Sequence, residues 1–281
     1  MTQPRDRIRN QQRATWNRFA PGWRSWDVTV VGWLGPVGEA IIREVRLTDT
    51  SNVLDVATGT GEPGLSAAAL VPQGRVTLTD LSERMLAAAS ANAARRKLSN
   101  VETRAADASA LPFADASFDA VLCRFGFMFF PDLAEAVREM ARVARPGGRV
   151  SAAVWAKPEK NPWATVIMGT IDRHVPRPAP ADDAPSLFRC AADGYLRKVF
   201  ELGGFRDITE TEVANALTLA SAEEYWQFMT DVAAPVVAGL AEADEATRAR
   251  IRAEVLRLAQ HHVRDGRLQI GSTAPVVTGT R

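Results

Sequence analysis

A glycine-rich turn within VLDVATGTGEPGLSAAAL (residues 53–70) carries the residues whose types and spacing most directly predict chemistry. Gly59, Gly61 and Gly64 spell G-x-G-x-x-G between a short β-rich run and an alanine-rich stretch. Where such a turn joins a strand to a helix, a nucleotide can approach the backbone N–H groups at the helix N-terminus. The motif alone therefore predicts a nucleotide-like ligand without saying which one.

Two residues beside the turn argue against a dinucleotide. The Glu62 carboxylate would lie near the place of a pyrophosphate and would repel it at close range. Pro63 removes one N–H donor from the start of the helix. Both residues are tolerable for a cationic ligand without phosphates. The turn thus favours S-adenosylmethionine over NAD, and an NAD(P)-dependent oxidoreductase remains the alternative.

Acidic residues follow the next two predicted strands. Asp80 lies about twenty residues after the glycines, where a carboxylate suits a ribose diol. Asp107 could accept from an adenine amino group, with Ala108 offering its backbone N–H. Each acid also has a purely structural explanation, as a helix N-terminal charge or a turn former. Together with the glycine turn they favour an adenosyl cofactor.

Strand and helix signals alternate through the middle of the chain, which predicts an α/β fold with a doubly wound parallel sheet. The predicted strands are 52–57, 74–80, 100–107, 118–125 and 146–156. Ser82 can cap one of the helices between them. Residues 157–187 are rich in Pro and Asp and are predicted to be a loop insertion. The remaining order of helix, strand, helices and strand predicts an antiparallel final pair interrupted by helices.

The chain resembles class I S-adenosylmethionine-dependent methyltransferases over about residues 50–156. The resemblance rests on VLDVATGTGEPGLSAA, LTDLSERMLAAA, AADASALPFADASFDAVLCRFGFMFFPD and RPGGRVSAAVW. It is closest to the ubiquinone/menaquinone-biosynthesis-type branch of small-molecule enzymes. The resemblance implies a Rossmann-like seven-stranded sheet with an antiparallel last strand. One departure is Ala57, where that family often has glycine.

The resemblance also implies roles for residues at matching positions. Asp80 would hold the ribose, Leu81 would flank the adenine, and Arg124 would face the methionine moiety or the substrate. Backbone atoms of the turn would line the methionine end, supported by Asp55. The implied cofactor-binding residues are Asp55, Ala57, Thr58, Gly59, Gly61, Asp80, Leu81, Asp107, Ala108 and Arg124. Gly64 is then expected to be a helix-packing residue.

Aromatic residues near the N-terminus predict the acceptor side of the site. Trp16, Phe19, Trp23 and Trp26 recur at helical intervals, although Pro21-Gly22 should break or kink the helix. They form either a face packed on the core or a mobile lid. The predicted pocket for a small apolar or aromatic acceptor comprises Trp16, Phe19, Trp23, Phe127 and Trp155.

These expectations combine into one methyltransferase domain over residues 1–281. Residues 1–40 are the expected aromatic lid and 41–156 the cofactor-binding core. The expected substrate cover is 157–187 and 214–264, and the final helix and strands are 188–213 and 265–281. In-line methyl transfer needs mainly positioning, and no catalytic residue is assigned. A non-catalytic S-adenosylmethionine-binding regulator is the second alternative.

The composition excludes several other classes of protein. A net charge of +1 does not favour nucleic-acid binding. No signal peptide is recognisable, and the longest apolar run is too short to span a bilayer. The isolated Cys123 and Cys190, with only three histidines, predict no metal site and no disulfide. We therefore expect a cytoplasmic enzyme of secondary metabolism that acts on a small molecule, and a homodimer is compatible with this.

Overall fold

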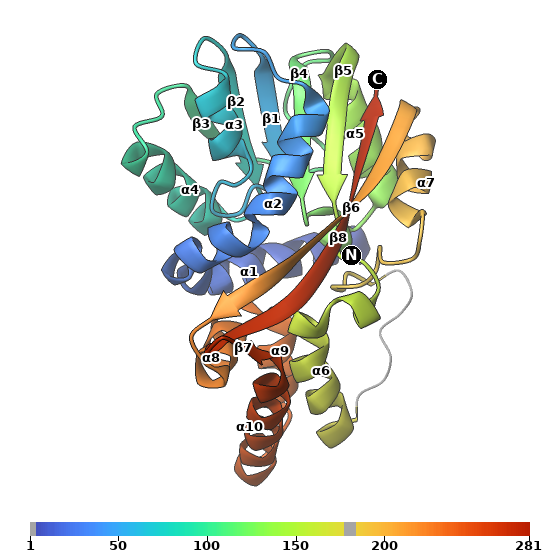
Figure 1. Ribbon diagram of the computed structural model, residues 1–281. Helices are drawn as coiled ribbons and strands as arrows, with labels where there is room; N and C mark the ends of the chain where they lie inside the picture. Colours follow the sequence, from blue (N-terminus) through green and yellow to red (C-terminus); the bar gives the residue numbers. More distant parts are fainter. Residues whose placement is uncertain (1–3, 177–183) are drawn as a thin grey trace.

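A mixed β-sheet forms the upper lobe of the molecule in Figure 1, and helices from the second half of the chain form the lower lobe. The computed structural model describes residues 4–176 and 184–281. The parallel part of the sheet contains β1 (Asn52–Val56), β2 (Arg75–Asp80), β3 (Val101–Ala105), β4 (Phe118–Arg124) and β5 (Ala144–Ala153). The whole sheet has the strand order β3-β2-β1-β4-β5-β8-β6, in which β6 is Arg206–Leu219 and β8 is Arg267–Thr280. In this order β1 and β4 lie side by side at the point where it reverses.

The last long strand runs against its neighbours. Strand β8 (Arg267–Thr280) lies between β5 and β6 (Arg206–Leu219) and is antiparallel to both. The short β7 (Val263–Arg264) pairs with the start of β8. These pairings confirm the predicted α/β sheet, its antiparallel last strand and the interrupted final pair.

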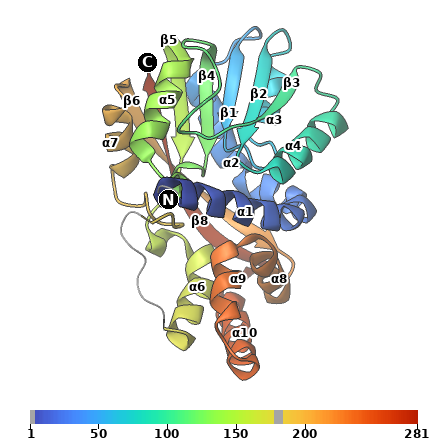
Figure 2. The same ribbon diagram turned by 180° about the vertical axis from the view of Figure 1, so that it is seen from behind.

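Helices cover both faces of the sheet. Helix α2 (Asp27–Val45) lies over the face that is in front in Figure 1, whereas α5 (Leu133–Val143) lies over the opposite face, in front in Figure 2. Helix α7 (Tyr195–Leu202) packs beside α5. Helix α3 (Gly64–Leu70) packs against β1 and β2, and α4 (Glu83–Arg95) packs against β2 and β3. The Ser82 side chain accepts a hydrogen bond from the Met85 N–H at 3.1 Å, as a helix N-cap does, which confirms its predicted role.

The lower lobe is inserted mainly between β6 and β8. It contains α6 (Pro162–His174), α8 (Ala222–Val232), α9 (Ala234–Ala241) and α10 (Glu245–Ala259), with the short η2 (Pro158–Lys160) and η3 (Gln260–His262) beside them. Strands β6 and β8 extend downward from the sheet and connect the two lobes (Figure 1). Among the described helices, none is long and apolar enough to cross a bilayer.

Helix α6 corrects the prediction that residues 157–187 are a loop. Asn161 holds its start, because the side-chain amide donates to the Ala156 carbonyl at 2.9 Å. Trp163, Ile167 and Ile171 then recur every four residues and are all buried, which stabilises a helix despite the Pro and Asp residues nearby. Residues 177–183, which carry some of those Pro and Asp residues, lie outside the described part of the chain.

Helix α1 (Pro4–Ser25) corrects the predicted break at Pro21-Gly22, since it continues through both residues. The chain departs from helical form only around Trp26, before α2 begins. Two indole N–H groups fasten this end of α1 to α8: Trp23 donates to the Val232 carbonyl at 3.1 Å, and Trp26 donates to the Asp231 carboxylate at 2.9 Å. These tertiary contacts offset the hydrogen bond that a proline removes from a helix.

The buried Trp33 joins the two lobes. Its ring stacks on Trp155 at the end of β5, with centroids 5.4 Å apart and planes at 19°. It meets Trp163 of α6 edge-on at 4.7 Å, and its indole N–H donates to the Ser272 hydroxyl of β8 at 2.8 Å. One side chain of α2 therefore contacts the sheet, the strand that leaves it and the lower lobe.

We expect Trp33→Ala to lower the free energy of unfolding by about 3–5 kcal/mol, because it removes a buried aromatic ring and its hydrogen bond. Urea denaturation measures this difference. Trp16→Ala is the matched control, since Trp16 is only partly buried, and we expect it to lower stability by about 1–2 kcal/mol. Equal losses in the two variants would show that Trp33 does not join the lobes energetically.

Candidate functional site

A cavity of about 910 Å³ lies between the two lobes, at the carboxyl ends of the parallel strands. Ligands of open α/β sheets bind at this edge, and the volume is that of a small-molecule site. Helix α1 lies between the two lobes (Figure 2) and lines the cavity. The strand ends, α1 and the lower lobe each contribute to its lining.

The glycine turn forms one wall of the cavity and is held from beneath by Asp55. One carboxylate oxygen of Asp55 accepts from the Thr58 hydroxyl at 2.7 Å and from the Gly64 N–H at 2.9 Å. A Cβ at Gly64 would overlap the Leu78 side chain and crowd Asp55, so Gly64 is a helix-packing residue, as expected. Asp55 therefore ties the end of β1 to the start of α3.

Left-handed backbone shapes the turn. Gly59 has φ +57° and Gly61 has φ +115°, a region that favours glycine. Ala57 adopts φ +58°, which is uncommon for a residue with a Cβ and explains why glycine would suit this position. Ala57, Thr58 and Gly59 line the cavity, whereas Asp55 and Gly61 lie behind this wall and support it.

Asp80 lines the same wall and orients the turn. Its carboxylate accepts from the Gly59 N–H at 3.0 Å and from the Ser82 N–H at 2.8 Å. Because a carboxylate can accept about four hydrogen bonds, it keeps acceptor capacity for ligand hydroxyls. Burial raises the pKa of Asp80 to about 6, against the opposing effect of these N–H donors. Holding the ribose stays the role that the sequence predicts for Asp80.

Asp107, Leu81 and Ala108 also line the cavity. The Asp107 carboxylate is engaged on both sides, because it accepts from the Ser109 N–H at 3.0 Å and forms an ion pair with Arg9 of α1. Nothing in the sequence indicates this ion pair. The pairing means that α1 closes directly over the position predicted for the adenine.

A second contact links α1 to the same region. The Asn17 side-chain oxygen accepts from the Ser82 hydroxyl at 2.7 Å, beside Asp80. Since the other end of α1 bonds to α8, this helix contacts both halves of the cavity. Phe19 is buried while Trp16 and Trp23 are partly buried, and all three line the cavity. The N-terminal aromatic face therefore packs on the molecule and also covers the site.

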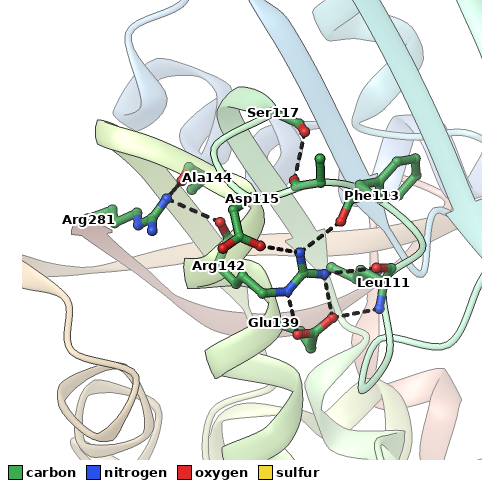
Figure 3. Close-up of polar contacts among 9 residues, drawn as sticks. Leu111, Phe113, Asp115, Ser117, Glu139, Arg142, Ala144 and Arg281 are labelled. Atoms are coloured by element: carbon green, nitrogen blue, oxygen red, sulfur yellow. Dashed lines mark hydrogen bonds and ion pairs between the residues drawn. The ribbon is translucent and has the colours of Figure 1, made fainter.

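Arg142 of α5 anchors the loop that carries Asp107 and Ala108 (Figure 3). Its guanidinium donates to both oxygens of Glu139, at 2.7 and 2.8 Å, and to Asp115 at 2.8 Å. It also donates to the carbonyls of Leu111 at 2.9 Å and Phe113 at 2.8 Å. Such a planar fork holds several loop positions at once.

Glu139 completes this anchor from the other side. Its carboxylate accepts from the Leu111 N–H at 2.8 Å, and the hydrogen bonds from Arg142 hold the pKa of Glu139 below its usual value. The Arg142 carbonyl accepts from the Ala116 N–H at 3.0 Å, so the backbone of α5 also holds the loop. The loop is therefore held in its conformation by contacts with α5, which do not involve a ligand in the cavity.

The acceptor half of the cavity is apolar and largely aromatic. Of the predicted pocket residues, Trp16, Phe19, Trp23 and Trp155 line it, but Phe127 does not. Phe127 is fully buried and packs on Phe130 and Phe200, because the short η1 (Phe127–Phe129) turns its ring toward the core. This placement corrects the expectation for Phe127.

Several lining residues were missed by the sequence analysis. Phe125, with φ +62°, stacks on Trp155 with centroids 4.0 Å apart and planes at 16°. The lower lobe adds further apolar side chains from α6, α8 and α9, namely Met168, Phe228, Met229, Val232 and Val237. Only the run CRFGFMFF carried a signal for Phe125, and nothing in the sequence separated it from Phe127.

Glu62 and Arg124 are the charged side chains beside the glycine turn in the cavity wall. Glu62 pairs with Arg96 at 2.5 Å, so its negative charge is partly compensated. The Arg124 guanidinium donates to the Leu34 carbonyl of α2 at 3.1 Å. Among the described residues, no group of His, Cys, Asp and Glu is arranged to hold a metal ion.

Comparison with known proteins matches this region to a family. Residues 53–148 match the family model described as a methyltransferase domain. An uncharacterised protein of Mycobacterium tuberculosis is 38% identical over 122 residues, which cover 43% of each chain. Demethylmenaquinone methyltransferase of Deinococcus radiodurans is 44% identical over 98 residues, 35% of this chain and 40% of that one. The matched segments thus span less than half of these relatives.

The fold is shared over a longer stretch. The crystal structure of a putative methyltransferase from Bacillus halodurans superposes with a TM-score of 0.54 at 21% identity. That superposition covers 86% of this chain and 97% of the other. It confirms the methyltransferase type of Rossmann-like fold.

We expect Arg142→Lys to lower the free energy of unfolding by about 2–3 kcal/mol in urea denaturation, because lysine cannot reproduce the planar fork. Arg138→Lys, on the exposed face of the same helix, is the control and should change stability by less than about 0.5 kcal/mol. The depressed pKa of Glu139 stabilises the fold above its ordinary value of 4.5. The difference between wild type and Arg142→Lys should therefore shrink as the pH falls below that value, and a constant difference would contradict the anchor.

We expect the affinity for S-adenosylhomocysteine to rise with pH and to level off above about 6, because Asp80 accepts ribose hydroxyls best when ionised. Isothermal titration calorimetry measures the dissociation constant at each pH. Asp80→Asn should weaken S-adenosylhomocysteine binding by about tenfold or more and remove the dependence of the affinity on pH near 6. If the variant keeps the same midpoint, another group such as Asp55, whose pKa burial raises to about 7, controls binding.

Proposed function

Because residues 53–148 form a class I S-adenosylmethionine-dependent methyltransferase domain of the quinone-biosynthesis type, we propose that this protein methylates a small aromatic or apolar acceptor. The observation that carries the proposal is the continuity of the cavity. It extends from the glycine turn and Asp80 to aromatic side chains of α2, β5 and the lower lobe without a break. A cofactor site and an acceptor site would therefore share one cavity.

The cofactor half is built to orient its ligand. When bound, S-adenosylmethionine supplies a methyl group on a positively charged sulfur. Asp80 would hold ribose hydroxyls, and Leu81 and Ala108 would contact the adenine. The backbone of Ala57, Thr58 and Gly59 would line the methionine end. Because Asp55 and Asp80 already fix this turn in position, little reorganisation is needed on binding.

The acceptor half is built to exclude water and to position a ring. Trp16, Phe19 and Trp23 cover it from α1, and Trp155 forms an inner wall. Placing an acceptor in line with the transferred group can supply much of the rate enhancement of such a reaction. Apolar and aromatic side chains make up most of this half, which favours an aromatic or isoprenoid acceptor over a small polar one.

We expect tritium from labelled S-adenosylmethionine to appear in an organic-extractable product when the protein is given reduced naphthoquinones that lack a ring methyl, or simple phenols. The apolar lining predicts no labelled product from ethanolamine phosphate, which serves as the polar control. Asp80→Ala should lower the labelling rate by about tenfold or more at limiting cofactor. Tight binding of S-adenosylhomocysteine without label in any aromatic acceptor would instead identify a non-catalytic cofactor-binding protein.

A further inference from the structure

A group of charged side chains lies in and behind the cavity wall at the glycine turn. It comprises Arg124 and the carboxylates that influence it, Glu62, Asp55 and Asp27. Buried charges are tolerated when each has a partner of opposite sign, and an unpartnered one is expensive to keep. The pairing within this group therefore decides which charge is available to a ligand.

Two of the carboxylates have arginine partners of their own. Asp27 pairs with Arg95 at 3.1 Å and also accepts from the Asn92 amide at 3.1 Å. Glu62 pairs with Arg96 at 2.5 Å and accepts from the Ser66 N–H at 3.2 Å. These two negative charges are thus compensated without Arg124.

The third carboxylate, Asp55, is only partly charged near neutral pH. Burial raises its pKa to about 7, even though Thr58, Gly64 and the nearby Arg124 favour the ionised form. In the described part of the chain no carboxylate forms an ion pair with Arg124, whose hydrogen bond goes to the uncharged Leu34 carbonyl. Arg124 is therefore the cation of this group that lacks an ion-pair partner in the described part of the chain, although the three carboxylates lie near enough to act on it electrostatically.

Arg124 is placed to offer this charge to the cavity. It lines the cavity at the end of β4, next to the residues of the glycine turn. A guanidinium carries five N–H donors in a planar fork that matches a carboxylate or another oxyanion. An anionic oxygen in the cavity would supply the missing counter-ion.

A stack of aromatic rings adjoins the Arg124 position. Phe125 adopts φ +62°, a costly conformation for a bulky residue, and strain of this kind gathers at functional sites. In this conformation its ring stacks on Trp155, which in turn stacks on Trp33. All three rings line the cavity. A ligand that satisfies both features is planar, aromatic and anionic.

We propose that Arg124 binds the anionic oxygen of an aromatic acceptor, which is a phenolate or an aryl carboxylate. The ring of this acceptor packs against the stacked side chains of Phe125 and Trp155. The inference rests on the proposed function and deepens it by giving the charge of the acceptor. The carboxylate of the cofactor offers the same chemistry from a second source, so the experiment must separate the two.

The test is calorimetric titration of the protein, saturated with S-adenosylhomocysteine at neutral pH, with naphthoate and with its uncharged amide. We expect naphthoate to bind about tenfold tighter than the amide, as charge-assisted hydrogen bonds do. Arg124→Met should bring the two affinities to within about threefold of each other, and Arg124→Lys should keep an intermediate preference. S-adenosylhomocysteine affinity should change by less than about threefold in both variants.

Arg18→Met is the control, because Arg18 also lines the cavity but lies on α1. It should keep the full preference for naphthoate. The proposal is overturned if wild type does not prefer naphthoate, or if the preference survives in Arg124→Met. It is also overturned if S-adenosylhomocysteine affinity falls about tenfold in that variant, because Arg124 then holds the cofactor carboxylate.

Thermal unfolding of each variant shows whether it is folded. If Arg124→Met does not fold, the naphthoate preference of Arg124→Lys tests the proposal instead. A complete loss of naphthoate preference in a folded Arg124→Lys would support the need for the guanidinium fork, and an unchanged preference would contradict it. Naphthoate is also titrated into the protein without S-adenosylhomocysteine, so that the contact with Arg124 is tested separately from the proposed function. Failure to bind S-adenosylhomocysteine counts against the proposed function alone.

Discussion

The buried carboxylate of Asp55 is the constraint on which the site depends. By accepting from Thr58 and Gly64 it closes the turn between β1 and α3. The turn then presents the Gly59 N–H to Asp80, which joins the ends of β1 and β2. These few bonds place the backbone of the glycine turn, and burial makes them strong because water cannot compete for the carboxylates.

The two lobes contribute different kinds of chemical group to one cavity. The sheet edge supplies fixed backbone groups and carboxylates, which suit a polar adenosyl ligand. The lower lobe supplies apolar and aromatic surface from helices inserted between β6 and β8. Trp33 and α1 connect these parts, because each contacts both lobes. The acceptor half thus depends on how the lobes are held together.

The charged side chains around this cavity differ in whether they have a partner of opposite charge. Asp27 and Glu62 have dedicated arginines, burial favours the neutral form of Asp55, and Arg124 is left with a carbonyl partner. Arg142 is the opposite case, because Glu139 and Asp115 fully engage it and it serves only to anchor a loop. Two arginines of the same domain therefore differ in role because of their neighbours and not their own chemistry.

The sequence by itself determined the sheet, the glycine turn and the cofactor. These rest on short-range physics: alternation of strands and helices, the three-residue step from Asp55 to Thr58, and the Ser82 cap. Residues that act through local hydrogen bonds are visible in a local pattern. Asp80 and Asp107 could be placed because the carboxyl ends of parallel strands meet at one edge.

Only the tertiary structure decided the features that depend on distant contacts. Helix α1 runs through Pro21 because α8 holds its end, and α6 forms because its apolar side chains are buried between the lobes. Arg9 pairs with Asp107, which lies far from it in the sequence. Phe125 and Phe127 differ by two positions, yet one lines the cavity and the other the core. No local pattern separates them, because the turn after β4 and the packing of Trp155 and Phe200 decide which way each ring points.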